Sequence, residues 1–288
     1  AERLSFASRI LRGTGLFLCG DLYHTLAPVI LKDDDGEVAF APLPYAEPGK
    51  VREALSTDVH THEEAERALS DFLLRQMGHA ARKIAIAHEF VAGGSASDSE
   101  RPLSIGGTDL ISADIFAPYN YTALGHLHGP QQAGGKENVR YSGSLLKYSF
   151  SEAAQKKGVI VGEIDGAGQV ETKFTSLAPR HEVRVIKGFF DDLIKGESED
   201  FLMAELLDEG PVIDAMARLR QKYPRMMTIQ SHRRMNSGSG ERSFDLMKKV
   251  DPLDMFRVFY KEFQDKEFTE EEENYMKELW EDLRKEDD

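Results

Sequence analysis

The spacing of apolar residues predicts a helix that leads directly into a buried strand in the first third of the chain. Thr61 and Glu64 form a capping-box pattern, which is typical of a helix N-terminus. Apolar residues then recur on one helix face, at Ala65, Leu69, Phe72, Leu73 and Met77. Short β-prone runs follow at Lys83 to Ala87 and at Tyr121 to Leu124. The pattern predicts a mixed α/β (α+β) fold.

The alternation of strand and turn signals continues through the middle of the chain. A strand is predicted near Asn138 to Tyr141, and a hairpin is predicted from Gly158 to Ile164 against Val170 to Leu177, around a glycine-containing turn. From about Pro179 the order changes to strand, strand, helix, strand, which indicates a small α/β unit. Its elements are expected at Val183 to Ile186, Phe201 to Leu206, Pro211 to Lys222 and Met226 to Ile229, with Pro211 as the first helical residue.

Two amphipathic helices are predicted at the C-terminal end, after a linker that contains the Gly/Ser-rich residues 231 to 240. Asp251 and Pro252 open the first helix, and the second begins with a capping box at Thr269 and Glu272. Their apolar faces consist of Leu253, Phe256, Tyr260 and Phe263 on one helix and Tyr275, Met276, Leu279 and Leu283 on the other. Short helices on such a linker cannot bury both faces by themselves, so they either pack on their own domain or bind a partner.

Histidines follow both of the β-prone runs. His88 comes directly after Ala87, and Gly125-His126-Leu127-His128 comes directly after Leu124. The carboxyl ends of strands are where α/β sheets bind their ligands. Glycine lets the backbone turn, so the two imidazole groups of a His-x-His pattern can reach a common centre. Surface histidines are the plainer alternative, but a third histidine at a strand end favours a metal site formed by His88, His126 and His128.

These segments resemble the SbcD family, the nuclease subunit of the bacterial SbcCD complex and a member of the calcineurin-like metallophosphoesterases. The resemblance covers nearly the whole chain. The matching segments are Ala87 to Gly94, Ser97 to Leu103 with Gly106 and Gly107, Tyr121 to His128, Arg140 to Glu152, and Glu205 to Pro224 with the C-terminal helices.

The resemblance implies a site with two divalent ions, Mn²⁺ or alternatively Mg²⁺. The family ligands that match His88 and His126 serve one ion, and the ligand that matches His128 serves the other. Family motifs that come earlier, Asp-x-His, Gly-Asp and Gly-Asn-His-Asp, carry the bridging Asp, the Asn and the catalytic His, and they do not occur in this sequence. Ala1 to Leu11 looks like the helix that follows Gly-Asn-His-Asp, so we expect a truncated chain that does not complete its own active site. Gly20-Asp21 is expected to be a turn.

Composition refines this interpretation. With 288 residues, 41% of them hydrophobic, the chain can bury a core for roughly two domains. Its one cysteine, Cys19, excludes an internal disulfide, and no apolar run reaches membrane-span length, so we expect a cytoplasmic protein.

The net charge of -14 is concentrated in residues 261–288, with 5 basic and 13 acidic side chains. Residues 221–249 reverse this, with 7 basic and 2 acidic, and form either a phosphate-binding patch or an ordinary solvated face.

The resemblance implies part of a calcineurin-like metallophosphoesterase domain, a β-sandwich flanked by helices, at residues 1–178, and a DNA-facing α/β capping domain at 179–230. The patterns described above add a linker at 231–250 and a helix pair at 251–288. The resemblance implies a metal-dependent DNA exonuclease or endonuclease in DNA repair and recombination. It also implies that the helix pair binds the coiled-coil base of an SbcC-type ATPase, in a heterotetramer that contains a homodimer of this subunit. The alternatives are a non-catalytic adaptor that links DNA to the ATPase, and a phosphatase on the same fold.

Overall fold

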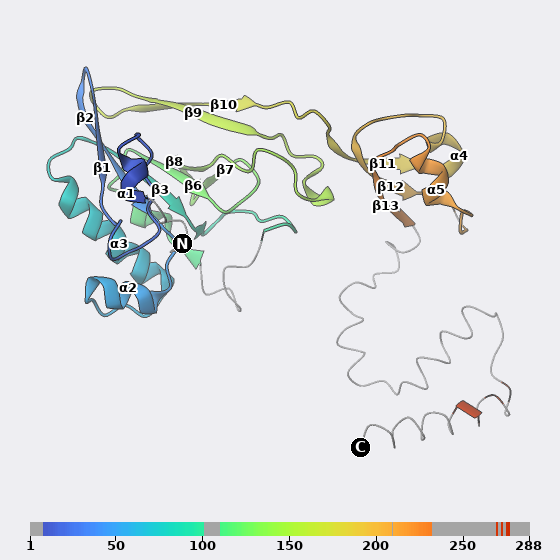
Figure 1. Ribbon diagram of the computed structural model, residues 1–288, viewed down its shortest axis with the longest axis horizontal. Coiled ribbons are helices and arrows are strands. Elements are labelled where there is room, and N and C mark those ends of the chain that lie inside the picture. Colours follow the sequence, from blue (N-terminus) through green and yellow to red (C-terminus); the bar gives the residue numbers. More distant parts are fainter. Residues whose placement is uncertain are drawn as a thin grey trace.

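The computed structural model describes residues 8–100, 110–208 and 210–231, together with 269, 272, 275 and 276. Within these residues the protein is a mixed α/β structure with several sheets and few helices. Figure 1 shows a larger part that carries the N-terminal elements and a smaller part that carries β11, β12 and β13, with the chain leaving strand β10 to reach the smaller part.

A six-stranded sheet forms the centre of the larger part, in the order β1-β2-β3-β6-β8-β7. Its strands are β1 (Val29–Asp33), β2 (Gly36–Leu43), β3 (Arg82–His88), β6 (Tyr121–Gly125), β7 (Gln131–Ala133) and β8 (Lys136–Tyr141). The four inner strands β2, β3, β6 and β8 are parallel to one another, whereas the edge strands β1 and β7 are antiparallel to β2 and β8, respectively. The predicted strands at 83–87, 121–124 and 138–141 are confirmed.

Helices α2 (Pro48–Leu55) and α3 (His62–Met77) bury one face of this sheet. The predicted capping box is present, because Thr61 Oγ1 accepts from the Glu64 amide at 3.2 Å and Glu64 Oε2 accepts from the Thr61 amide at 3.2 Å. The predicted stripe also faces inward. Ala65, Leu69, Leu73 and Met77 are buried with Ala39, Ala41, Ala85 and Ala87 of the sheet, and Phe72 is partly buried against the same cluster.

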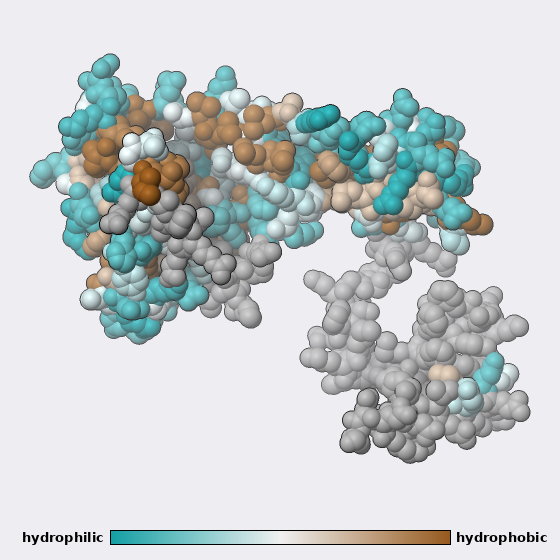
Figure 2. Space-filling view, in the orientation of Figure 1, coloured by the Kyte–Doolittle hydropathy of each residue, from teal (hydrophilic) through white to brown (hydrophobic). Residues whose placement is uncertain are grey.

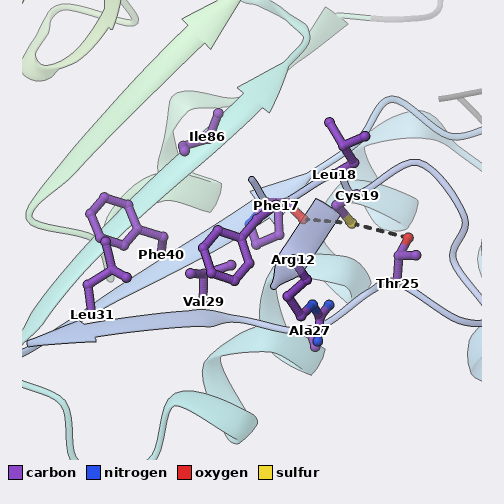
Figure 3. A pocket seen from close by; sticks show the side chains of 11 residues that line it. Arg12, Phe17, Leu18, Cys19, Thr25, Ala27, Val29, Leu31, Phe40 and Ile86 are labelled. Carbon is purple, nitrogen blue, oxygen red and sulfur yellow. Dashed lines mark hydrogen bonds between the residues drawn. The ribbon is translucent and has the colours of Figure 1, made fainter. Parts of the chain in front are cut away.

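The opposite face of β1, β2 and β3 carries large apolar side chains that remain partly exposed. Leu31 and Ile86 are 48% and 50% exposed, and they line a pocket of about 260 Å³ with Phe17, Val29 and Phe40. Figure 3 shows these side chains converging from the three strands and from the segment after α1 (Ser8–Arg12). Figure 2 shows apolar surface over the same region of the larger part. The two faces of the sheet are therefore unequal in burial.

Several shorter elements lie outside the six-stranded sheet. The predicted hairpin is confirmed as β9 (Gly158–Ile164) paired with β10 (Val170–Ser176). After His88 in the chain, the two-residue strands β4 (Phe90–Val91) and β5 (Leu110–Ile111) pair with each other, and the short 3₁₀ helix η2 (Ala113–Phe116) follows β5. A second 3₁₀ helix, η3 (Phe150–Glu152), follows β8. A turn follows Gly20-Asp21 rather than lying on it: it occupies residues 22–25, and the Asp21 carbonyl accepts from the Thr25 amide at 3.0 Å.

The smaller part is a parallel three-stranded sheet in the order β11-β12-β13. Its strands are β11 (Val183–Gly188), β12 (Phe201–Leu206) and β13 (Met226–Ser231), which confirms the three predicted strands. The short helices α4 (Phe190–Leu193) and α5 (Ala215–Arg220) pack on it through a core that includes Phe190, Leu202 and Leu219.

The predicted extent of the helix from Pro211 to Lys222 is wrong. Helix α5 begins only at Ala215, because Asp214 adopts a left-handed conformation with φ of 52° that an α-helix does not contain. Pro211 is therefore not the first helical residue. The fixed φ of a proline is compatible with several turn conformations, so the proline alone does not position a helix start.

Of the predicted linker at 231–250 only Ser231 is described, and it ends strand β13, so the predicted start of the linker is wrong by one residue. The C-terminal helix pair lies outside the described residues apart from positions 269, 272, 275 and 276. Among these, the Thr269 amide donates to Glu272 Oε2 at 2.9 Å, and the Glu272 amide donates to Thr269 Oγ1 at 3.3 Å. The second predicted capping box is thus confirmed. Of the predicted N-terminal helix, Ser8–Arg12 is described as α1, and residues 1–7 lie outside the description. No helix in the described part of the chain has the length and apolar character needed to span a membrane.

Helix α3 carries a buried carboxyl group that should make stability depend on pH. Glu66 is only 3% exposed, and its Oε1 has no hydrogen-bond partner among the described residues. Burial raises the pKa of Glu66 from about 4.5 to about 8. Between these two values the folded state holds a proton that the unfolded state releases, so the free energy of unfolding falls as pH rises.

We expect Glu66→Gln to remove this dependence. Relative to the unaltered chain, the variant should gain about 1 to 3 kcal/mol of stability between pH 5 and pH 8, as measured by denaturant unfolding at both pH values. Glu63→Gln is the matched control, because Glu63 lies on the same helix in an exposed pair with Arg67. An equal pH response of the Glu66 and Glu63 variants would contradict the prediction.

Candidate metal centre

The register of two adjacent parallel strands brings His88 and His126 together. Strand β3 ends at His88 and β6 ends at Gly125, and these two residues are register partners. His126 is the next residue, so its ring emerges at the same edge of the sheet. The ring centroids of His88 and His126 are 5.5 Å apart, and the rings are nearly perpendicular. The sequence-based expectation that both imidazole groups leave the sheet at strand ends is confirmed.

Two backbone features make this approach possible. A Cβ atom on Gly125 would lie 2.9 Å from His88 Nδ1, so only glycine lets the His88 ring rest against β6. His126 has φ of 108°, a backbone conformation that residues other than glycine rarely adopt. Such strain persists where surrounding structure enforces it, and it is concentrated at functional sites.

The protonation state of His88 suits a metal ligand. Burial lowers the pKa of His88 below its ordinary value, because the protonated ring is poorly solvated there. The neutral ring has a free nitrogen lone pair, which is the form of histidine that binds metal ions. Phe90 packs near the other ring, with its centroid 5.8 Å from that of His126.

His128 lies in a separate network that is built around a buried carboxylate. Its Nδ1 is 2.9 Å from Glu152 Oε1 and 3.0 Å from Ser99 Oγ, and the Glu152 side chain has no exposed surface. Glu152 also forms an ion pair with Lys157, with 2.6 Å between Oε2 and Nζ. Backbone groups of His128 join the network, because its amide donates to Glu100 Oε1 at 2.7 Å and its carbonyl accepts from Lys157 Nζ at 2.8 Å.

The charge of Glu152 determines how His128 is oriented. Burial alone would raise the pKa of Glu152, but hydrogen bonds from Lys157, Ser99 and His128 outweigh it and hold the pKa at about 2. Glu152 is therefore ionised near neutral pH and accepts a hydrogen bond from Nδ1–H of His128. A ring that donates from Nδ1 leaves Nε2 free as a ligand, the arrangement found where a carboxylate orients a metal-bound histidine.

Gly143 explains why the His128 loop and the loop after β8 pack so closely. A Cβ at this position would lie 2.6 Å from the His128 carbonyl oxygen and 2.9 Å from Pro130 N, and Gly143 has φ of 79°. The neighbouring Ser144 amide donates to the same His128 carbonyl at 3.0 Å. The Tyr-Ser-Gly-Ser pattern at 141–144 therefore has a structural role beside His128.

Sequence reasoning assigned no role to the residues that hold His128. Ser99, Glu100 and Glu152 lie in segments that resemble SbcD proteins, and this resemblance was the one available signal for them. Lys157 lies outside those segments. No helical or strand periodicity relates these residues, because the contacts join loops distant in the sequence.

The donor set fits part of a divalent metal site. His88 and His126 offer two imidazole groups at one place, and His128 offers a third from the oriented ring. The carboxylate in contact with His128 is occupied by Lys157, so neutral nitrogen donors are the main contribution of these residues. In the described part of the chain, no three or more His, Cys, Asp or Glu side chains are grouped closely enough to hold a metal ion.

Comparison with known protein families provides independent information about the C-terminal part. Residues 179–263 match the family model SbcD_C, described as the type 5 capsule protein repressor C-terminal domain. This region begins just before β11 and contains the small sheet β11-β12-β13. The chain therefore carries an SbcD-related C-terminal domain.

Proposed function

We propose that this chain is part of a metal-dependent DNA nuclease of the SbcD type, which hydrolyses phosphodiester bonds at DNA ends together with an SbcC-type ATPase. The observation that carries the proposal is the His88–His126 pair at the ends of β3 and β6, in a chain with an SbcD-related C-terminal domain. In this proposal, residues up to 178 belong to a calcineurin-like phosphoesterase domain and the SbcD-related domain faces DNA.

The proposed roles of the histidines follow from their surroundings. His88 and His126 hold one divalent ion, Mn²⁺ or alternatively Mg²⁺, and His128 serves a second through Nε2. Divalent ions supply the positive charge that stabilises the attacking and leaving oxygens of a phosphodiester. Glu152 and Lys157 keep the His128 ring in one tautomer and orientation. Neutral imidazoles add no negative charge, so carboxylate ligands are needed as well for tight binding.

The first prediction concerns metal binding by the chain itself. Gly125→Ala should weaken Mn²⁺ binding by about 10-fold or more, because the added methyl group displaces the His88 ring from His126. Paramagnetic broadening of histidine ring signals during a Mn²⁺ titration would measure this. Gly162→Ala is the control, because a Cβ in that β9 position meets only ordinary contacts at 3.7 Å or more. Equal broadening of the histidine signals in both variants would mean that His88 is not a ligand of the metal ion.

The second prediction concerns catalysis by the protein expressed from its whole coding sequence. His88→Ala, His126→Ala and His128→Ala should each remove most Mn²⁺-dependent cleavage of linear duplex DNA. DNA affinity should change little, because phosphate contacts dominate it. Glu152→Gln should lower turnover by roughly 10 to 100-fold, as expected for a residue that orients a ligand.

These measurements also separate the alternatives. A protein that binds DNA and the ATPase without any metal-dependent cleavage would be an adaptor, and one that cleaves phosphomonoesters in preference to DNA would be a phosphatase. Near-normal turnover of one histidine variant at saturating Mn²⁺ would remove that residue from the ligand set.

The third prediction concerns the proposed ATPase contact of residues 251–288. Phe256→Ala should weaken binding of this chain to the coiled-coil base of the ATPase by at least roughly thirtyfold, because a central aromatic anchor contributes about 2 kcal/mol or more. Arg257→Ala is the control at the adjacent polar position. The acids at 270–273 should affect mainly the association rate and its salt dependence. Unchanged binding of a Phe256→Ala, Tyr260→Ala double variant would mean that the helices pack within their own chain.

A further inference from the structure

A hollow of about 320 Å³ lies where the loop after β8 meets the small sheet. One wall comes from the loop, with Tyr148 and Phe150, and the other comes from the small sheet and the segment before it, with His181, Phe201 and Met227. Its volume is within the range of small-ligand sites, which begins at about 300 Å³. The side chains that form its walls are mainly aromatic and apolar.

Tyr148 connects this hollow to the candidate metal centre. Its side chain is 67% exposed although it lines the hollow, and its ring centroid is 5.2 Å from that of His128. Its backbone amide donates to Glu152 Oε2 at 3.3 Å, so the carboxylate that orients His128 also positions Tyr148. An exposed aromatic ring is thus held beside a proposed metal ligand.

The opposite wall offers a second aromatic surface. Phe201 is 38% exposed, and the His181 ring meets it edge-on at 6.2 Å. The Arg225 guanidinium lies 5.9 Å from the centroid of the Phe201 ring. These contacts hold the Phe201 ring in place and leave part of it open to the hollow.

Two of the cations at or beside the hollow are already paired. Lys147 forms an ion pair with Glu182 and donates to the Ala153 carbonyl at 2.8 Å, and Arg225 forms an ion pair with Glu199. An occupant would gain little from binding its phosphates to these side chains. Aromatic surfaces with neutralised charges favour instead a flat, uncharged ring, which gains by stacking.

We propose that this hollow receives an unpaired nucleobase of a DNA strand, with Tyr148 as the stacking surface. The inference rests on the proposed nuclease function. That function brings a phosphodiester of the DNA to His128, and the base of the same nucleotide then lies within reach of Tyr148. A base inside a duplex is stacked on both faces and cannot enter the hollow, so the base must come from a single-stranded or opened end.

The test uses the whole chain with a chelator present, so that metal binding plays no part. Affinity is measured by fluorescence anisotropy for oligodeoxythymidylate and for a sugar-phosphate oligomer of equal length and charge without bases. The unaltered chain should bind the oligomer with bases at least about fivefold more tightly. Tyr148→Ala should bind both equally, whereas Tyr148→Phe should behave as the unaltered chain. Tyr23→Ala, which removes another exposed tyrosine, should change nothing.

The ratio between the two oligomers should also vary little with salt, because stacking releases no counterions. Absence of base-dependent binding in the unaltered chain, or its survival in Tyr148→Ala, would overturn the inference. These outcomes are independent of cleavage. Loss of the proposed nuclease function would appear as an absence of Mn²⁺-dependent hydrolysis in the whole protein, with base-dependent binding intact.

Discussion

The parallel pairing of β3 with β6 is the constraint on which the candidate centre depends. A shift of one residue in this register would move His88 away from Gly125 and turn alternate side chains to the other face of the sheet. The register is held because Ala85 and Ala87 of β3 and Leu124 of β6 are buried in the core beneath α3. Hydrophobic burial below the sheet thus sets the distance between two imidazole rings at its edge.

His88 and His126 are positioned by backbone, whereas His128 is positioned by charge. The first two depend on the absence of a side chain at Gly125 and on an unusual φ at His126. His128 depends on an ionised buried Glu152, whose charge is balanced by Lys157. Removing one member of a buried charge pair leaves its partner uncompensated, which costs more than the contact itself contributes. Two kinds of substitution should therefore disturb the same centre through different causes.

The parts of the fold that depend on local signals were predictable, and those that depend on distant contacts were not. The start of helix α3 and the second capping box are each indicated by a four-residue capping pattern, and β3 and β6 are indicated by short β-prone runs. The start of α5 was missed because a left-handed Asp214 is not encoded by any pattern around Pro211. The three histidines were identifiable as candidates, but the partners of His128 were not. Ser99 and Glu152 are 53 residues apart, and only the folded chain brings them together.

A buried lysine side chain joins the larger part to the SbcD-related domain. Lys147 lies in the loop after β8, and its side chain is only 8% exposed. Its ammonium group donates to the Ala153 carbonyl, to Glu182 just before β11 and to the Val183 carbonyl at the start of β11. An ammonium group has three donors, so these acceptors satisfy it and favour one arrangement of the loop relative to the small sheet. Tyr148 is the next residue, and its ring contacts that of His128. A change in the position of Lys147 would therefore move Tyr148 and, through it, affect His128 of the candidate centre.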